Sequence, residues 1–282
     1  SGKKVVFVCN NLAMGLEGEF QKTDFRQRVL SHEIKFPFAG MAEHNVVWVH
    51  ESVMTLLEGR RKSNLLNYPY SYQDLSRMIQ GIKQTGKVKP LIWWDFSFGT
   101  IINVKALHAI VLANGGGYAN SEFSNIASEN NAVTKAIKNY LFFAVRYEEY
   151  INAMNIKWLP DGIFSCNVPE SVYWKDLCFE KNISPVHKQY YLHLINLPGN
   201  ENYKKYSQLP GMENIAVKTK IPEGWEISEV KLLSPDVAQE PVSLKYKPIE
   251  SNTMQYIIPR LQVWDFIIID MRRSVEHQSC PK

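Results

Sequence analysis

The sequence predicts an α/β segment followed by an all-β segment. In residues 1–158, continuous apolar runs alternate with amphipathic helical patterns, which is typical of parallel strands covered by helices. Beyond Leu159-Pro160, strand patterns follow one another with Pro and Gly turns between them, as in an antiparallel sandwich. We therefore expect one domain over residues 1–158 and a β-sandwich domain over residues 159–282.

Four apolar runs are the expected strands of the first domain. They are residues 5–9 (VVFVC), 46–49 (VVWV), 91–94 (LIWW) and 109–113 (AIVLA). The fourth run can equally continue a helix from Val104, because a short apolar run does not separate strand from helix.

Two helices are expected among these strands. Ser71 with Asp74 forms a capping pattern, and the helix it opens stops at Gly86. Its apolar stripe consists of Leu75, Met78, Ile79 and Ile82. A second, longer helix begins after Ser128 or Asn131, and its apolar positions are Val133, Ile137, Tyr140, Leu141, Ala144, Tyr147 and Ile151.

Six strands are expected in the second domain, separated by Pro and Gly turns. They cover residues 190–197, 215–221, 227–233, 242–246, 254–258 and 263–270.

Charge and composition exclude several classes of function. The 32 basic and 28 acidic residues give a net charge of only +4, so we expect no nucleic-acid or membrane-surface partner. The apolar run 263–269 is far shorter than the ~20 residues of a membrane helix. The histidines and the four cysteines do not have the spacing of metal ligands, so we expect no metal site. The sequence contains no phosphate-binding glycine motif, and we expect no cofactor. Cys166 and Cys178 could pair, or all four thiols could be free.

Polar or aromatic residues follow each apolar run of the first domain. Chemistry in a β/α barrel takes place at these carboxyl ends of the strands. The candidate site residues are Asn11, Glu51, Trp94, Asp95 and Tyr118.

Glu51 is the catalytic candidate among them. It shares a strand face with Val47 and Val49, and an apolar surrounding would raise the pKa of its carboxyl toward that of a general acid. A structural alternative is that Glu51 caps the next segment or pairs with a nearby basic residue of 60–62.

Five segments resemble glycoside hydrolase family 66, which includes endo-dextranases and cycloisomaltooligosaccharide glucanotransferases. They are residues 46–52 (VVWVHES), 106–118 (ALHAIVLANGGGY), 139–150 (NYLFFAVRYEEY), 193–199 (HLINLPG) and 259–267 (PRLQVWDFI). The last two are the most specific and resemble "HLINLLG" and "P-x-L-x-x-WD" of the β-domain behind that family's barrel. The chain departs from the family pattern at Asn120 and Ser121.

The resemblance implies a retaining glycosidase acting on α-1,6-glucan, with Glu51 as acid/base and no cofactor. It also implies that the four runs are strands five to eight of a (β/α)8 barrel, so that the first domain is the C-terminal half of a barrel. The family's aspartate nucleophile would then precede Ser1, and Asp24 does not take its role. By the same resemblance the protein is expected to be secreted or at the cell surface.

Three readings of function remain open. In the first, the chain is a glycoside hydrolase fragment completed by its missing half. In the second, it is a non-catalytic carbohydrate-binding or assembly module that uses the aromatics Trp93, Trp94, Tyr118 and Trp264. In the third, it is an unrelated β/α enzyme that uses Asp95 and Glu51 together. The expected partners are an α-glucan oligo- or polysaccharide and either a second copy of the chain or the missing N-terminal half, because a half-barrel has open strand edges.

Overall fold

The computed structural model describes residues 5–9, 24, 27–28, 31, 46–50, 72–73, 75–77, 79–80, 90–94, 101–120, 132–151, 156–197 and 209–274. The chain divides into two compact units. Unit 1 is residues 1–152 with 198–208, and unit 2 is residues 153–197 with 209–282. The predicted boundary after residue 158 stays a prediction.

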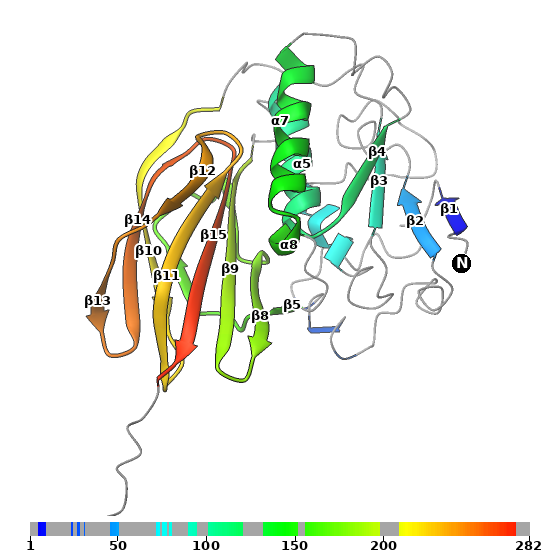
Figure 1. Cartoon of the computed structure of the whole chain (residues 1–282). Coiled ribbons are helices and arrows are strands. Elements are labelled where there is room, and N and C mark those ends of the chain that lie inside the picture. Colours follow the sequence, from blue (N-terminus) through cyan, green and yellow to red (C-terminus); the bar gives the residue numbers. More distant parts are fainter. Residues whose placement is uncertain are drawn as a thin grey trace, which may run out of the picture. The chain divides into compact units, whose positions relative to one another are not determined.

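Unit 1 contains a four-stranded sheet in which all neighbouring strands are parallel (Figure 1). Its strands follow sequence order: β1 (Val5–Cys9), β2 (Val46–His50), β3 (Pro90–Trp94) and β4 (Gly117–Asn120). The first three are the expected apolar runs. Continuous apolar runs are typical of strands in parallel sheets, and this pattern located them.

The fourth predicted strand is wrong. Residues 109–113 belong to the helix α5 (Ile101–Ala113), and β4 begins only at Gly117. Most of α5 is buried around its whole circumference, so its sequence is apolar without a helical stripe and imitates a buried strand.

A glycine cap ends α5. Gly115 has φ 67°, and its N–H donates to the carbonyl oxygen of Leu112 at 2.9 Å. The Gly116 N–H donates to the carbonyl oxygen of Val111 at 2.9 Å, which completes a Schellman motif. The Gly-Gly-Gly run therefore stops a helix and starts β4, instead of following a strand.

The two expected helices are present in the described residues. Residues 72–73, 75–77 and 79–80 are helical, with Leu75 and Ile79 buried. The second is α7 (Ala132–Arg146), followed after Tyr147 by the short α8 (Glu148–Ile151). α7 packs against α5, where Tyr140 meets the ring of His108 edge to face at 5.8 Å between centroids (Figure 1).

Unit 2 is an antiparallel β-sandwich, as the turn-separated strand patterns predict (Figure 1). One sheet has the order β13-β14-β10-β6, and the other has the order β12-β11-β15-β9-β8-β5 with β7 beside β9. The strands are β5 (Ile156–Trp158), β6 (Phe164–Cys166), β7 (Val172–Tyr173), β8 (Cys178–Ser184), β9 (His187–Asn196), β10 (Met212–Lys220), β11 (Trp225–Ser234), β12 (Ala238–Ser243), β13 (Tyr246–Glu250), β14 (Thr253–Leu261) and β15 (Trp264–Arg273).

The core of unit 2 lies between its two sheets. Alternate residues of β9 and β15, such as Leu192 and Ile267, enter this core and meet Val217 and Ile258 of the other sheet. The last strand of the described chain, β15, lies in the middle of its sheet, between β11 and β9. The predicted strand 242–246 is wrong as a single element, because the chain turns at Leu244 and Lys245 between β12 and β13.

Candidate functional site

The carboxyl ends of the parallel strands of unit 1 lie at one edge of the sheet. Cys9 at the end of β1 pairs with His50 at the end of β2, and Trp94 at the end of β3 pairs with Asn120 at the end of β4. Parallel pairing in near register makes these four ends neighbours, which is the arrangement on which the predicted site depends.

Two predicted site residues lie in this sheet. Trp94 is the last residue of β3. Tyr118 lies in β4 rather than after it, and it pairs with Ile92, two residues before Trp94. Trp94 and Tyr118 therefore occupy equivalent alternating positions on neighbouring strands. Asn11, Glu51 and Asp95 lie outside the described residues, so that their gathering at the sheet edge stays a prediction.

A buried polar network fixes the end of α5 just before β4. The Asn114 amide donates to the Ser76 hydroxyl at 2.9 Å and to the Ile110 carbonyl oxygen at 2.7 Å. The Gln80 amide donates to the Asn114 carbonyl oxygen at 2.6 Å. Because these partners meet each other's hydrogen-bonding needs, the network holds the helix bearing Ser76 and Gln80 to α5 and has a structural role.

His108 of α5 is held neutral. Burial lowers the pKa of its ring to about 4. The hydrogen bond between Nδ1 and the Val104 carbonyl oxygen is 2.7 Å long and raises the pKa, but by less than burial lowers it. The neutral ring donates from Nδ1, packs against Tyr140 and carries no charge at neutral pH.

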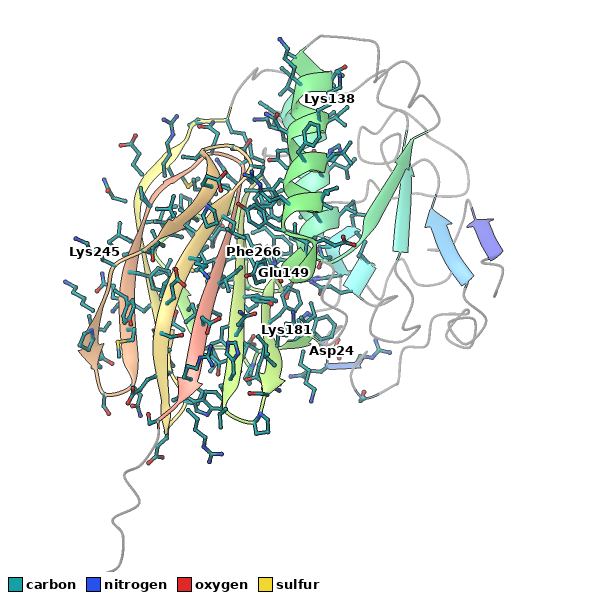
Figure 2. The ribbon with its side chains drawn as sticks, in the orientation of Figure 1. Asp24, Lys138, Glu149, Lys181, Lys245 and Phe266 are labelled. Atoms are coloured by element: carbon teal, nitrogen blue, oxygen red, sulfur yellow. The ribbon has the colours of Figure 1, made fainter. Side chains whose placement is uncertain are left out.

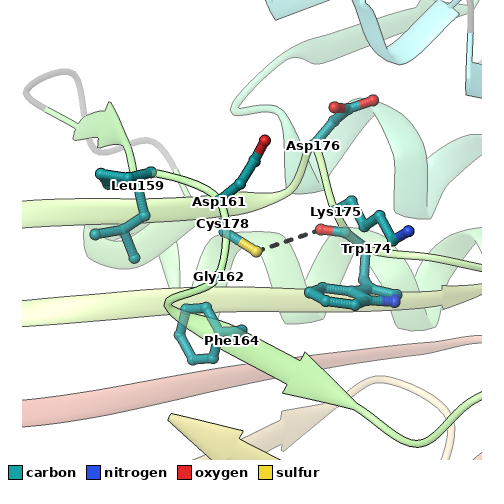
Figure 3. A pocket seen from close by; sticks show the side chains of 9 residues that line it. Leu159, Asp161, Gly162, Phe164, Trp174, Lys175, Asp176 and Cys178 are labelled. Carbon is teal, nitrogen blue, oxygen red and sulfur yellow. Dashed lines mark hydrogen bonds between the residues drawn. The ribbon is translucent and has the colours of Figure 1, made fainter. Parts of the chain in front are cut away.

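Unit 2 contains a cavity of about 380 Å³ that the sequence patterns did not reveal. Its lining residues are Leu159, Pro160, Asp161, Gly162, Phe164, Trp174, Lys175, Asp176 and Cys178. In Figure 3, Trp174 and Phe164 lie on one side of it and the carboxylates of Asp161 and Asp176 on the other.

Two loop segments form the walls of this cavity, and hydrogen bonds hold them in place. The Leu159 N–H donates to the Cys178 carbonyl oxygen at 3.0 Å and ties one wall to the other. The Trp174 carbonyl oxygen accepts from the Leu177 N–H at 2.8 Å and from the Cys178 thiol at 3.4 Å. Gly162, with φ 82°, makes the turn that follows Asp161. The cavity is therefore preformed.

The only signal for this cavity in the sequence is the run YWKD at residues 173–176, which places an aromatic ring beside two charges. The run begins at the last residue of β7 and ends just before β8, two strands that periodicity does not detect. Neither Cys166 nor Cys178 is in a disulfide, and burial raises the pKa of Cys166 to about 12.

A buried carboxyl lies at the start of β15. Asp265 is fully buried opposite Leu194 of β9, and neither of its oxygens has a hydrogen-bond partner within 3.5 Å. Burial raises the pKa of Asp265 well above its ordinary value; the nearby Ser234 hydroxyl acts against this, and the charge of Asp236 adds to it. The Ser234 hydroxyl itself donates to the Trp264 carbonyl oxygen at 3.2 Å. Burial therefore favours the protonated, uncharged form of the Asp265 carboxyl in the folded protein.

Trp264 does not provide a surface for a ligand. It is 0% exposed and donates from its indole N–H to Nδ1 of His193 at 3.3 Å. The His193 ring also stacks on Phe266, labelled in Figure 2, at 4.0 Å between centroids. The suggestion that Trp264 binds a saccharide is thus wrong, because this aromatic cluster is part of the protein interior.

The described part of the chain contains no group of three or more His, Cys, Asp or Glu side chains able to hold a metal ion. Among the same residues, no helix is long and apolar enough to span a membrane.

No protein-family model and no characterised protein sequence matches the chain. Among solved structures, a cycloisomaltooligosaccharide glucanotransferase from Paenibacillus sp., complexed with cycloisomaltoheptaose, matches 61% of the chain at 20% identity with a TM-score of 0.49. The match spans 27% of that enzyme.

Two other enzymes named for carbohydrate substrates are also similar in structure. Alpha-L-fucosidase isoenzyme 2 from Paenibacillus thiaminolyticus matches 56% of this chain and 21% of its own, at 14% identity and a TM-score of 0.27. CelM2, a bifunctional glucanase-xylanase from a metagenome library, matches 89% of this chain and 50% of its own, at 12% identity and a TM-score of 0.34. These neighbours are glycoside hydrolases or glucanotransferases by name, and with TM-scores below 0.5 the likeness does not assign a family.

Proposed function

We propose that the chain is the C-terminal part of a retaining glycoside hydrolase or transglucosidase that acts on α-1,6-glucan, with Glu51 as its acid/base. The observation that carries this proposal is the four-stranded parallel sheet in sequence order, whose strand ends share one edge. Glu51 directly follows the last residue of β2 in the sequence, so we expect it at that edge. Unit 1 is then half of a (β/α)8 barrel.

The proposed chemistry uses two carboxyl groups. Glu51 protonates the glycosidic oxygen while a carboxylate from outside these 282 residues attacks the anomeric carbon, so that the leaving sugar departs as an alcohol and a glycosyl ester forms. Glu51 then removes a proton from water, or from a second sugar hydroxyl, which attacks the ester and releases the nucleophile. The two carboxyl groups of retaining enzymes lie ~5–5.5 Å apart.

Trp94, Asp95, Asn11 and Tyr118 are proposed to line the sugar subsites at this edge. Ring faces pack on sugar C–H groups, and the amide and carboxylate hydrogen-bond hydroxyls. The proposed partners are an α-glucan and either a second copy of the chain or the segment that completes the barrel. In the described part of the sheet, β1 and β4 each pair with one strand, which leaves two edges for such pairing.

The first test is the coding sequence upstream of Lys3. The proposal expects four further β/α units there, one of them with an aspartate at its strand end. An open reading frame that begins at this point would overturn the interpretation as an enzyme part.

The second test uses the chain coexpressed with that upstream segment. Release of reducing sugar from dextran should fall at least about 100-fold in Glu51→Gln, the range for loss of a general acid. In kcat/KM, which reports the first step, an aryl glycoside with a good leaving group should lose far less, because departure of that group needs no proton. Glu58→Gln, a nearby acid with no assigned role, is the matched control. Equal loss on both substrates would remove Glu51 from the acid/base role.

A further inference from the structure

We propose that the cavity on unit 2 between residues 159–164 and 174–178 is a binding site for a neutral saccharide, separate from the strand-end site of unit 1. This site goes beyond the proposed catalytic function and does not require it. All nine of its lining residues belong to unit 2.

The size of the cavity fits a small ligand. Small-molecule pockets span about 300–1,000 Å³, and this cavity of about 380 Å³ lies at the lower end. A single sugar ring or a short oligosaccharide is the appropriate class. The Cβ position of Gly162 has no atom within 4 Å, so that the cavity is open on the side of this turn.

The lining has the two kinds of surface that a sugar needs. One side is apolar and aromatic, with Trp174 and Phe164, and suits the C–H face of a pyranose (Figure 3). Trp174 is half-buried and packs on the sandwich core, which fixes the indole, whereas its remaining surface lines the cavity. An indole held in this way binds with little loss of side-chain entropy.

The polar side indicates a ligand rich in hydroxyl groups. The carboxylates of Asp161 and Asp176 can only accept hydrogen bonds, which suits the hydroxyl groups of a sugar. The Lys175 ammonium can only donate hydrogen bonds, and a ring or glycosidic oxygen can accept them. The Tyr173 hydroxyl donates to Oδ2 of Asp176 at 3.0 Å and orients that carboxylate. The lining has two acidic groups and one basic group, so its net charge is negative and repels anions. A neutral saccharide is therefore favoured over a sugar phosphate or a uronic acid.

The site also explains why the half-buried Trp174 directly precedes two charged residues, Lys175 and Asp176, in the segment between β7 and β8. Trp174 and Trp225 are both partly exposed and both pack against the same core. Trp225, however, contacts the Lys188 ammonium at 4.3 Å from its ring centroid and does not line this cavity. The two tryptophans thus form a matched pair for experiment.

The test is calorimetric titration of the 282-residue chain with isomaltotriose, maltotriose, cellotriose and xylotriose, each at up to millimolar concentration. At least one should bind. Trp174→Ala should weaken that binding at least about tenfold, as expected for loss of a central aromatic contact. Trp174→Phe should restore part of the affinity, Asp161→Asn should weaken it, and Trp225→Ala should leave it unchanged.

Glu51→Gln separates this site from the strand-end site. Binding that survives Glu51→Gln but not Trp174→Ala supports the cavity, whatever the fate of the catalytic proposal. Thermal denaturation of each variant checks that it is folded, and the exposed Asp161 supplies a variant with little effect on folding. The proposal is overturned if none of the four sugars binds, if neither Trp174→Ala nor Asp161→Asn weakens binding, or if only Glu51→Gln does.

Discussion

Asp265 should make the stability of unit 2 depend on pH, and Asp265→Asn should remove that dependence. The carboxyl is fully buried and has no hydrogen-bond partner, and burial raises its pKa well above the ordinary value. The unfolded chain titrates this group near the ordinary value of about 3.9. Between that pH and the raised folded pKa, the folded state holds one proton more than the unfolded state.

The sign and ceiling of the effect follow from this difference. The stabilisation that the protonated carboxyl contributes is complete below the unfolded pKa and is lost as the pH rises toward the folded pKa. The loss is at most about 1.4 kcal/mol per pH unit, so from pH 5 to pH 7 it reaches at most about 2.7 kcal/mol. An amide of the same shape does not titrate, and therefore its contribution is the same at every pH.

The assay is urea unfolding at pH 5, 6 and 7, followed by tryptophan fluorescence. The free energy of unfolding of Asp265→Asn minus that of the original chain should rise steadily with pH. Other titrating groups cancel in this difference, including Asp270, whose hydrogen bonds from Gln189, Ser228 and His187 outweigh partial burial and lower its pKa. A flat difference for Asp265→Asn would refute the reasoning.

Three further predictions concern the core, a helix end and assembly. Leu192→Ala, at a fully buried position between the sheets, should lower the free energy of unfolding of unit 2 by about 2–5 kcal/mol in the same assay. Ile257→Ala, at a position that is 41% exposed, should lower it far less. Equal effects would contradict the assigned core. Gly115→Ala should destabilise unit 1 by about 1–2 kcal/mol, because a residue with a Cβ atom is strained at φ 67°. A thermal midpoint no lower than that of the original chain would contradict the role of Gly115 in the helix cap. In sedimentation at micromolar concentration the chain alone should form a dimer through the edges of its parallel sheet, and a monodisperse monomer would contradict that expectation.

The sequence predicted the elements whose residue patterns are regular. The runs at β1 and β2 are strongly apolar and flanked by polar residues, and the long strands β9 and β15 show clear patterns with turn signals beside them. In α5 the same reasoning failed, because a helix buried on every side has no stripe to distinguish it from a strand. β7, with two residues, is too short for any period, and β8 mixes exposed and buried positions irregularly.

The candidate sites differ in how far the sequence could reveal them. Strand-end positions such as Trp94 follow directly from locating the strands, so that the edge could be predicted before its geometry was known. The cavity on unit 2 could not, because Asp161 and Trp174 come from separate turns. The hydrogen bond between Leu159 and Cys178 and the folding of the sandwich bring these segments together.

The position of β15 has a consequence for synthesis of the protein. This strand is the last of the described chain, but it lies between β11 and β9 in the centre of its sheet, so one edge of β9 and one edge of β11 have no partner until it is in place. On a translating ribosome, β9 and β11 would therefore expose unpaired edges until residue 273 has emerged. Premature termination anywhere before Trp264 would remove the centre of the sheet rather than its margin, and the nascent chain would depend on chaperones longest at this point.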